Sequence, residues 1–431
     1  MKIAVIADDL TGAGDTGIQL GKKGMAVSVL LDIRQTASAA ADAVVFDTDS
    51  RSVPKTEAYR RVQAVCSWIR QLQEIDLVYK KIDSTFRGNI GTEMDSVYDA
   101  FQPDFVVLAP SYPRFGRIVK NGQLFVHGIP LHETDTAKDP KNPVTLSSIP
   151  ELVRQQTARR LAAIPLAALR GDREQMSRML KLYKEEGTAY LLFDAENETD
   201  LKTIVSIFRR EEYKVVWSGS AGLADALSGQ WNSGSQGKND VLSPAGGRVL
   251  TVVGSVSTCS RIQLERVLRR PDVHGIKMCS NLILKDEERR KEMERIAGIA
   301  EAIPLSEQKH IVLYSSGSPH EVREAVDTGA RLGMNAGEVS SSVSRALGEA
   351  AARIIAAQRL RNLVLTGGDT ARQVLLQLGA SEIELIDEVE PGIPVGRLSG
   401  EDSCFVITKA GGFGNDDSLN NAIDILKAER L

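Results

Sequence analysis

Cysteine is scarce in this chain of 431 residues: four are scattered singly, and no two stand in CxxC spacing. A structural zinc site or a disulfide framework is therefore not expected, and a reduced compartment fits. No apolar run approaches the roughly 18–20 residues that cross a bilayer. The opening MKIAVIADD reaches two aspartates by residue 9, so it lacks the apolar core of a signal peptide. We expect a cytoplasmic protein with no membrane partner.

Excess charge of one sign is also lacking, because the formal net charge is only -4. This balance argues against a nucleic-acid-binding surface spread over the whole chain. It is compatible with a local basic pocket. Hydrophobic residues make up 42% and charged residues 26%, as is usual for globular proteins. The length suggests two or three domains.

Short apolar runs alternate with amphipathic stretches along most of the chain. Helical spacing of apolar residues occurs at 55–73 and 89–101. The strand-like runs are 2–7, 26–32, 43–49, 77–83, 105–111, 190–196, 214–220, 248–255, 275–280, 310–317, 362–368 and 404–412. This alternation predicts an α/β fold with mostly parallel sheets flanked by helices.

One polar stretch interrupts the alternation and divides the chain. Residues 231–247 are rich in Gly, Ser and Asn and have no periodicity, which is typical of a linker. We therefore expect one domain over 1–230 and a second over 248–431. A long polar insertion, 112–149, lies within the first domain. It is either a functional lid or a surface excursion with a hairpin around Asn121-Gly122.

The first strand-like run leads into a glycine-rich segment that fits more than one motif. Gly12, Gly14 and Gly17 satisfy G-x-G-x-x-G, and Asp32 follows at about the spacing of a ribose-binding acid. An NAD(P)-dependent oxidoreductase is therefore the alternative function. Against it, the segment 8–11 separates the strand from the glycines, and its two carboxylates would repel a pyrophosphate.

A P-loop is excluded at the same place, because Ile18-Gln19 stand where Lys-Ser/Thr is required. What remains is a strand that ends in paired acids and leads into a helix. Asp8 and Asp9 suit hydroxyl recognition or general-base work, and the structural alternative is that one of them caps the helix.

Further strand ends carry concentrated polar chemistry. Ligands of open parallel sheets bind beyond the carboxyl ends of strands, so these side chains should meet near Asp8 and Asp9. The cations and the hydroxyl-binding groups together fit a ligand with one carboxylate and several hydroxyls. The cations are Arg51, Lys81 and Arg87, and the hydroxyl-binding groups are Asp9, Asp83 and Asn89.

The second half of the chain has four small-residue corners after strands. Gly367-Gly368 precede a helix that Asp369 or Thr370 opens, and similar corners surround Ser255, Gly317 and Gly411-Gly412. Glycines let the backbone approach a ligand, and free helical N–H groups favour phosphate oxygens. A phosphate-rich ligand is consistent with these corners, although each one alone more often only turns the chain.

With these segments in order, the chain resembles the four-carbon acid sugar kinase family. The motifs are IADDLTGAGDTG, DSR, KKIDSTFRGNIG, LTGGDTA and KAGGFG, and the similarity spans essentially the whole chain. The resemblance implies an ATP-dependent kinase of the 4-hydroxyl of D-threonate, D-erythronate or a 3-oxo-tetronate. It also implies that the first domain binds the sugar acid, that the second binds ATP, and that the active site lies in the cleft between them.

Carried onto this sequence, the resemblance implies two sets of contacts. The substrate-binding residues are Asp9, Arg51, Lys81, Asp83, Ser84 and Arg87. The ATP-binding residues are Ser255, Gly367, Gly368, Asp369, Thr370, Gly411 and Gly412. Mg²⁺ would arrive with ATP, and no metal ligand of the protein is predicted.

A catalytic hypothesis follows from these contacts. Asp9, or Asp83 as the second choice, would orient or deprotonate the attacking hydroxyl. Lys81 or Arg87, with ATP-bound Mg²⁺, would neutralise charge on the transferred phosphoryl group. The sequence does not distinguish between the three acids. It does not determine the oligomeric state either, so a homo-oligomer is compatible with it.

Overall fold

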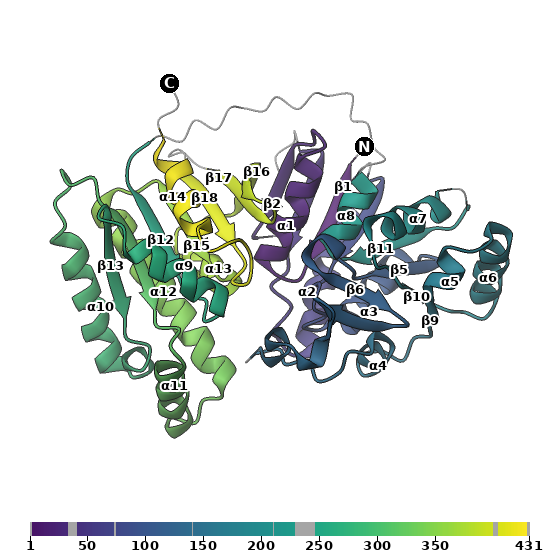
Figure 1. Ribbon diagram of the computed structural model, residues 1–431, viewed down its shortest axis with the longest axis horizontal. Coiled ribbons are helices and arrows are strands. Elements are labelled where there is room, and N and C mark those ends of the chain that lie inside the picture. Colours follow the sequence, from purple (N-terminus) through teal and green to yellow (C-terminus); the bar gives the residue numbers. More distant parts are fainter. Residues whose placement is uncertain are drawn as a thin grey trace. The chain divides into compact units, whose positions relative to one another are not determined.

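A computed structural model describes residues 2–32, 41–72, 75–139, 141–209, 211–228, 246–399 and 404–428. The chain divides into two compact units, Met1–Gly237 and Lys238–Leu431, and each is described by itself. The predicted linker lies outside the described residues apart from 246 and 247, so the predicted domain limits stay predictions. Figure 1 colours the first unit from purple to teal and the second from green to yellow.

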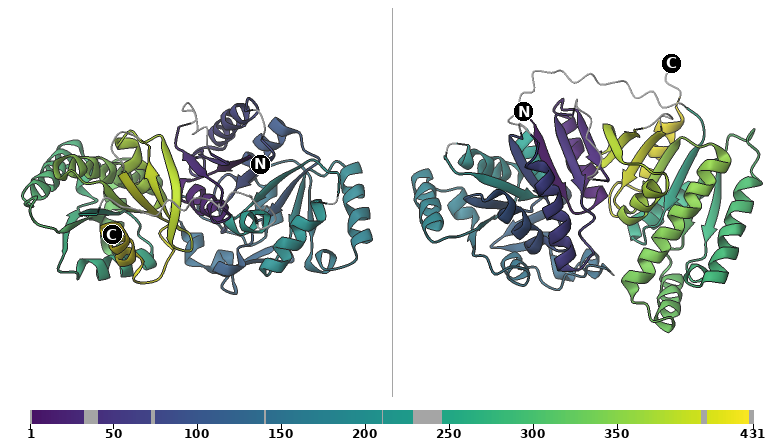
Figure 2. Two further views of the ribbon diagram at one scale, coloured as in Figure 1. Left: turned by 90° about the horizontal axis from the view of Figure 1, so that it is seen from above. Right: turned by 180° about the vertical axis from the view of Figure 1, so that it is seen from behind.

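The first unit is built on eight parallel strands in the order β2-β3-β1-β4-β11-β5-β10-β9. The strands are β1 (Ile3–Ala7), β2 (Val27–Leu30), β3 (Ala43–Asp47), β4 (Leu77–Lys81), β5 (Phe105–Ala109), β9 (Leu161–Ile164), β10 (Tyr190–Phe193) and β11 (Val215–Gly219). Every residue of β1, β3 and β5 is buried, because helices cover both faces of the sheet (Figure 2).

In the described residues of this unit, eight α-helices accompany these strands. They are α1 (Leu10–Gly21), α2 (Lys55–Ile69), α3 (Ile90–Phe101), α4 (Ile149–Arg154), α5 (Leu166–Leu169), α6 (Arg173–Glu185), α7 (Glu198–Phe208) and α8 (Ala221–Ser228). Helix α2 buries Ala58, Val62, Val65 and Ile69, the apolar stripe seen in the sequence. Helix α1 packs on α8, and α2 packs on α3.

The insertion at 112–149 forms a small antiparallel sheet. Its strands are β6 (Arg117–Lys120), β7 (Gln123–Val126) and β8 (Ile129–Pro130). Asn121 and Gly122 turn the chain with φ of 51° and 69°, as a tight hairpin turn requires. The carboxylate of buried Asp194 accepts both of their N–H groups, at 2.6 and 2.9 Å. The hairpin is confirmed, and this anchoring does not fit a freely moving lid.

The second unit has a sheet in the order β13-β14-β12-β15-β18-β17-β16. The strands are β12 (Val249–Val253), β13 (Val273–Met278), β14 (His310–Ser315), β15 (Asn362–Thr366), β16 (Glu382–Glu390), β17 (Ile393–Leu398) and β18 (Cys404–Lys409). The first five in the sheet are parallel, whereas β17 and β16 continue it antiparallel. The sequence missed this last pair, because charged residues fill β16 and hide its apolar positions.

Helices again cover the sheet of the second unit. They are α9 (Thr258–Leu268), α10 (Asp286–Glu301), α11 (Pro319–Arg331), α12 (Ala336–Gln358), α13 (Gly368–Gln377) and α14 (Ser418–Lys427). Helices α9 and α14 pack together, and α12 packs on α13 and α10. The predicted α/β architecture of two mostly parallel sheets flanked by helices is therefore confirmed. Among the helices of the described ranges, none has both the length and the apolar character that a membrane crossing demands.

Both sheets reverse their strand order next to their first strand. In the first unit the chain adds β2 and β3 on one side of β1 and then places β4 on the other side. In the second unit β13 and β14 lie on one side of β12, and β15 lies on the other. Such a switch point opens a crevice beyond the carboxyl ends of the two strands, where open α/β sheets bind their ligands.

Candidate functional site

The first candidate site surrounds the switch point between β1 and β4. The register pairs Ala7 with Asp47 on one side and with Lys81 on the other, so three strands end level with one another. Asp8 and Asp9 leave β1, Arg51 follows β3, and the segment 82–87 leaves β4. The structure thus brings together side chains from three distant parts of the sequence, as the strand-end pattern predicted.

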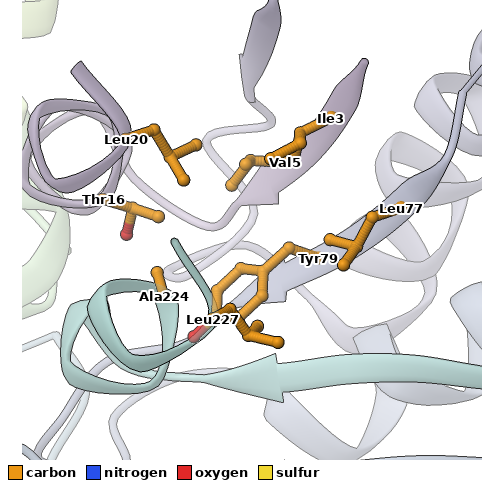
Figure 3. A pocket seen from close by; sticks show the side chains of 8 residues that line it. All are labelled: Ile3, Val5, Thr16, Leu20, Leu77, Tyr79, Ala224 and Leu227. Carbon is orange, nitrogen blue, oxygen red and sulfur yellow. The ribbon is translucent and has the colours of Figure 1, made fainter. Parts of the chain in front are cut away.

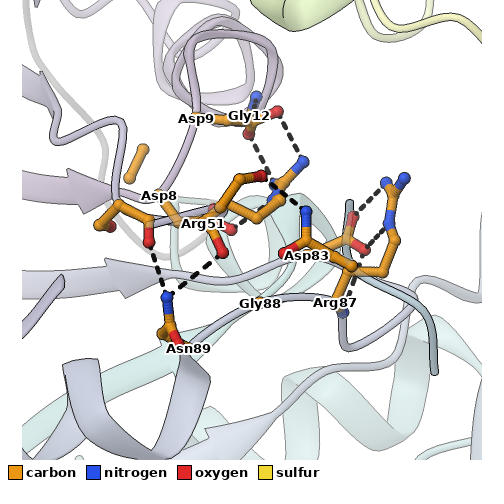
Figure 4. A network of polar contacts seen from close by, with 12 residues as sticks. Asp8, Asp9, Gly12, Arg51, Asp83, Arg87, Gly88 and Asn89 are labelled. Carbon is orange, nitrogen blue, oxygen red and sulfur yellow. Dashed lines mark hydrogen bonds and ion pairs between the residues drawn. The ribbon is translucent and has the colours of Figure 1, made fainter. Parts of the chain in front are cut away.

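Arg51 joins the two acids that follow β1. Its Nε donates to Asp8 Oδ2, and its Nη1 and Nη2 donate to the two carboxylate oxygens of Asp9, each at 2.7 Å (Figure 4). Asp8 is only 1% exposed. Burial works against its ionisation, but the charges of Arg51 and Lys80 outweigh burial and lower the pKa of Asp8.

Asp9 combines this ion pair with a structural role. It is the N-cap of α1, where Oδ1 accepts the Gly12 N–H at 2.9 Å, and Oδ2 accepts the Thr11 hydroxyl at 2.7 Å. Together with the two bonds from Arg51, the carboxylate accepts four hydrogen bonds, which is about its full capacity. The capping alternative therefore holds for Asp9, which was also the first choice for the catalytic acid.

The segment after β4 forms a second acid–arginine pair. Arg87 donates to Asp83 through Nε at 2.6 Å and Nη2 at 3.1 Å, and to Asp139 through Nη1 at 3.0 Å. Burial opposes ionisation of Asp83, but the charges of Arg87 and Arg51 outweigh it and hold the pKa of Asp83 well below its usual range. A guanidinium group has five N–H donors, and Arg51 and Arg87 each use three of them in hydrogen bonds to carboxylates. Two N–H donors of each arginine therefore remain for other acceptors.

Lys81 and Ser84 complete the predicted substrate set. Lys81 is 4% exposed, and Ser84 is also buried. A methyl group on Gly12 would lie 2.6 Å from Asp9 Oδ1 and 2.8 Å from Lys81 Nζ. The ammonium of Lys81 therefore lies close to Asp9 at the start of α1, and no side-chain oxygen in the described ranges accepts a hydrogen bond from it.

Asn89 has a different task from the predicted one. Its Nδ2 donates to the carbonyls of Ser50, Arg51 and Val53 at 2.8–3.3 Å (Figure 4). The NH₂ group of Asn89 is therefore occupied by backbone carbonyls, and the prediction that this group binds a substrate hydroxyl is wrong. Gly88, with φ of 96°, approaches Arg51 so closely that a Cβ would lie 2.8 Å from its Cγ. The Gly-Asn pair thus fixes the loop that carries Arg51.

The sequence analysis missed three charged groups near this site. Arg117 on β6 is half-buried; the loss of water around its guanidinium lowers its pKa, and the charges of Asp83 and Asp15 oppose this change. Behind Asp8, the buried side chains of Lys80 and Glu93 form an ion pair at 2.7 Å. Arg117 lies in the polar insertion, and no local pattern distinguishes it from a surface arginine.

A small cavity in the first unit does not belong to this site. It lies between the sheet and helices α1 and α8 (Figure 3), and its lining consists of Ile3, Val5, Thr16, Leu20, Leu77, Tyr79, Ala224 and Leu227. The lining residues of β1 and β4 come from before the carboxyl ends of these strands. We interpret it as a packing void in the apolar layer.

The second candidate site surrounds the switch point between β12 and β15. A Cβ on Gly411 would lie 2.1 Å from Ser255 Oγ, and one on Gly367 would lie 3.4 Å from the Ser255 nitrogen. A Cβ on Gly254 would lie 2.0 Å from the hydroxyl of Thr370. The corners after β12, β15 and β18 therefore meet, and only glycine permits approaches this close.

Backbone donors are available at this second site. Gly367, with φ of 95°, is the N-cap of α13 and offers no side-chain cap, and the N–H groups of Gly368 and Thr370 in the first turn donate to no acceptor within the described ranges. Gly412 is exposed and has open space around its Cα. The predicted ATP-binding residues are thus gathered in one place, on a surface suited to phosphate oxygens.

Neither site, as far as the described ranges extend, gathers a cluster of metal-ligating side chains. Within the described ranges, no group of three or more His, Cys, Asp or Glu side chains is placed to hold an ion. Mg²⁺ bound to nucleotide phosphates keeps several waters and needs only one or two protein carboxylates. The exposed carboxylate of Asp369, at the start of α13, fits such a minor role.

Comparison with known proteins agrees with this division of the chain. A family model of a sugar-binding N-terminal domain matches residues 3–227, and one of a nucleotide-binding C-terminal domain matches residues 250–419. A D-threonate kinase of Salmonella typhimurium is 36% identical over 98% of each chain. A D-erythronate kinase of Heliobacterium modesticaldum is 31% identical over 98% of this chain and 97% of its own.

Solved structures agree as well. A crystal structure from Salmonella typhimurium, named provisionally as a tRNA synthase, has a TM-score of 0.79 at 28% identity and covers 98% of both chains. A Haemophilus influenzae protein has a TM-score of 0.72 at 23% identity over 98% of this chain and 100% of its own, which supports the fold alone. The chain belongs to the four-carbon acid sugar kinase family.

The oxidoreductase alternative receives no support from these relatives. The position of the glycines also argues against it. Gly12, Gly14 and Gly17 all lie inside α1, whereas the dinucleotide fingerprint needs its first glycine in the turn before the helix.

Proposed function

We propose that the protein transfers the γ-phosphoryl group of ATP to the 4-hydroxyl of a four-carbon sugar acid. The observation that supports this most is the pairing of a carboxylate–cation cluster at the β1/β4 switch point with a glycine-lined corner at the β12/β15 switch point. The carboxylate–cation cluster suits a small polyhydroxy anion, and the glycine-lined corner suits phosphates.

D-threonate is the first candidate acid. One relative that carries this name is 36% identical and two others are 31% and 30% identical, against 31% for the D-erythronate kinase and 27% for a 3-oxo-tetronate kinase of Methylobacterium radiotolerans. We propose that the substrate carboxylate takes the N–H donors that Arg51 and Arg87 keep free. The hydroxyls then lie toward Lys81, Asp9 and Asp83.

In this mechanism Asp9 exchanges one of its four intramolecular donors for the attacking hydroxyl and orients it, and Lys81 stabilises the charge of the transferred group. Phosphoryl transfer through a loose transition state depends mainly on positioning and electrostatics, so a strong base is not required. Asp83 is the weaker candidate for a base, since its depressed pKa makes its carboxylate a poor proton acceptor. When bound with ATP, Mg²⁺ would supply charge neutralisation at the phosphate oxygens, and the exposed carboxylate of Asp369 would help to hold it.

An ADP-release assay tests the proposal. The panel consists of D-threonate, D-erythronate, their L-forms and a 3-oxo-tetronate, and we expect turnover with at least one D-acid or the oxo acid. In parallel, ADP-Mg²⁺ should raise the melting temperature and NAD(H) should not. Release of ADP with none of the acids would refute the proposed substrate class.

The Asp9→Asn variant tests the role of this residue. We expect kcat to fall about 10²-fold or more, because the neutral amide cannot pair with Arg51 or orient the hydroxyl as a carboxylate does. Asp76→Asn is the matched control, since Asp76 is exposed and accepts the Lys2 N–H at the amino end of β4. A kcat near that of the wild type in Asp9→Asn would remove Asp9 from the mechanism.

A further inference from the structure

Lys409, the last residue of β18, is a buried cation without a carboxylate partner at ion-pair distance in the described part of the chain. It is 1% exposed, so its ammonium does not reach a ligand. Its Nζ donates to three backbone carbonyls of the loop that follows: Ala410 at 3.0 Å, Gly411 at 3.3 Å and Phe413 at 3.0 Å. An ammonium group has three donors, and all three are used within this loop.

Other side chains hold the same carbonyls from the same side. The Gly411 carbonyl also accepts the hydroxyls of Ser257 at 2.7 Å and Ser260 at 2.8 Å. The Phe413 carbonyl also accepts Nε2 of Gln263 at 3.2 Å. The inner face of the loop is therefore saturated with donors that hold its carbonyl oxygens inward.

Peptide planarity carries this constraint to the outer face. In a trans peptide the C=O of one residue and the N–H of the next point in opposite directions, and the described chain contains no cis peptide. The inward carbonyls of Ala410, Gly411 and Phe413 therefore turn the N–H groups of Gly411, Gly412 and Gly414 outward. None of these three N–H groups donates to an acceptor within the described ranges. Successive outward N–H groups form an anion-binding concavity.

We propose that Lys409 is a positioning residue, which organises the 410–414 loop into a phosphate cradle by drawing its carbonyls inward. The inference rests on the proposed nucleotide site and assigns a task to a residue that never touches the nucleotide. Its charge acts through the orientation of the loop, so it should govern nucleotide affinity and leave sugar-acid affinity unchanged.

The geometry implies a dependence on pH. Burial lowers the pKa of Lys409 to about 8. The titratable groups that act on it are Cys259 on α9 and Glu390 at the end of β16. Burial raises the pKa of the Cys259 thiol, so the thiol stays neutral near pH 8. Above pH 8 the ammonium loses its proton, and its hold on the carbonyls weakens.

Stability and affinity should respond to pH in opposite directions. The folded pKa lies below the unfolded value of 10.5, so the folded protein releases this proton first and gains stability as pH rises from 8 to 10.5. Nucleotide affinity falls over the same interval. The phosphates of the nucleotide do not titrate between pH 8 and 10.5, because the pKa of their last proton is about 6.

The experiment measures ADP-Mg²⁺ binding by calorimetry and the KM values of ATP and the acid. Lys409→Met should weaken ADP binding and raise the KM of ATP at least about tenfold, the scale of a lost charged hydrogen bond, without changing the KM of the acid. Gln358→Met is the matched control. It removes a buried donor from the Ala300 and Ile303 carbonyls at the amino edge of the same sheet, and ADP affinity should stay within about twofold.

Equal weakening in both variants would show that Lys409 only stabilises the fold, and would overturn the proposal. If Lys409→Met does not fold, the wild-type profile decides. We expect the Kd of ADP to rise at least about tenfold between pH 7.5 and pH 9.5, and a flat profile would overturn the inference. A wild-type protein that binds no ADP at pH 7.5 would instead refute the proposed nucleotide site.

Discussion

Arg51, whose side chain is 13% exposed, allows a quantitative test of what holds the first site together. Arg51→Met removes three hydrogen bonds of 2.7 Å and leaves Asp8, at 1% exposure, without its nearest cation. Removing one partner of a buried ion pair costs about 3–5 kcal/mol. The charge of Lys80 still stabilises the ionised Asp8. We therefore expect the free energy of unfolding to fall by about 3 kcal/mol, the lower end of this range.

This loss should appear in thermal unfolding. For a unit of this size, about 3 kcal/mol lowers the melting temperature by about 6–12 °C. Arg170→Met is the matched control in the same unit. Arg170 also makes three hydrogen bonds to carboxylates, at 2.7, 2.8 and 3.2 Å, but its side chain is 47% exposed. We expect less than half of the shift, since exposed pairs contribute little.

The pH dependence gives an independent check. The lowered pKa of Asp8 contributes stability that is present above the unfolded value near 4 and is lost as pH falls through the folded value. The variant lacks this contribution, so its deficit should be largest above pH 5 and should shrink toward pH 3.5. A variant that melts within 2 °C of the wild type, or like the Arg170 control, would refute the reasoning.

Two further substitutions test single contacts. Gly12→Ala should favour the helix by about 1 kcal/mol on intrinsic propensity. Its methyl group would, however, meet Asp9 and Lys81 at 2.6 and 2.8 Å. We therefore expect kcat/KM for the acid to fall about 10²-fold in steady-state assays, with ADP affinity unchanged; unchanged kcat/KM would contradict this packing. Asp194→Asn removes the charge that holds two N–H groups of the hairpin turn, at about 1–3 kcal/mol. Amide exchange in 117–126 should accelerate, and equal exchange would show that the apolar contacts suffice.

Much of the fold could be predicted from the sequence, because burial of a strand or of one helix face is a local property. The runs at 43–49 and 105–111 contain β3 and β5, whose residues are all buried. The predicted stripe at 55–73 is the buried face of α2. Strand β16 escaped because acids occupy five of its nine positions and hide its apolar pattern. The ordered motifs were also enough to recognise the family.

Only the tertiary structure decided the partners within the site. Strand order is set by long-range packing, so the sequence does not reveal that β1 and β4 flank one switch point and β12 and β15 the other. For the same reason it does not reveal that Asn89 binds backbone or that Lys409 gathers three carbonyls. Residue types and their order are local information, whereas the partner of a buried charge depends on which distant segment packs against it.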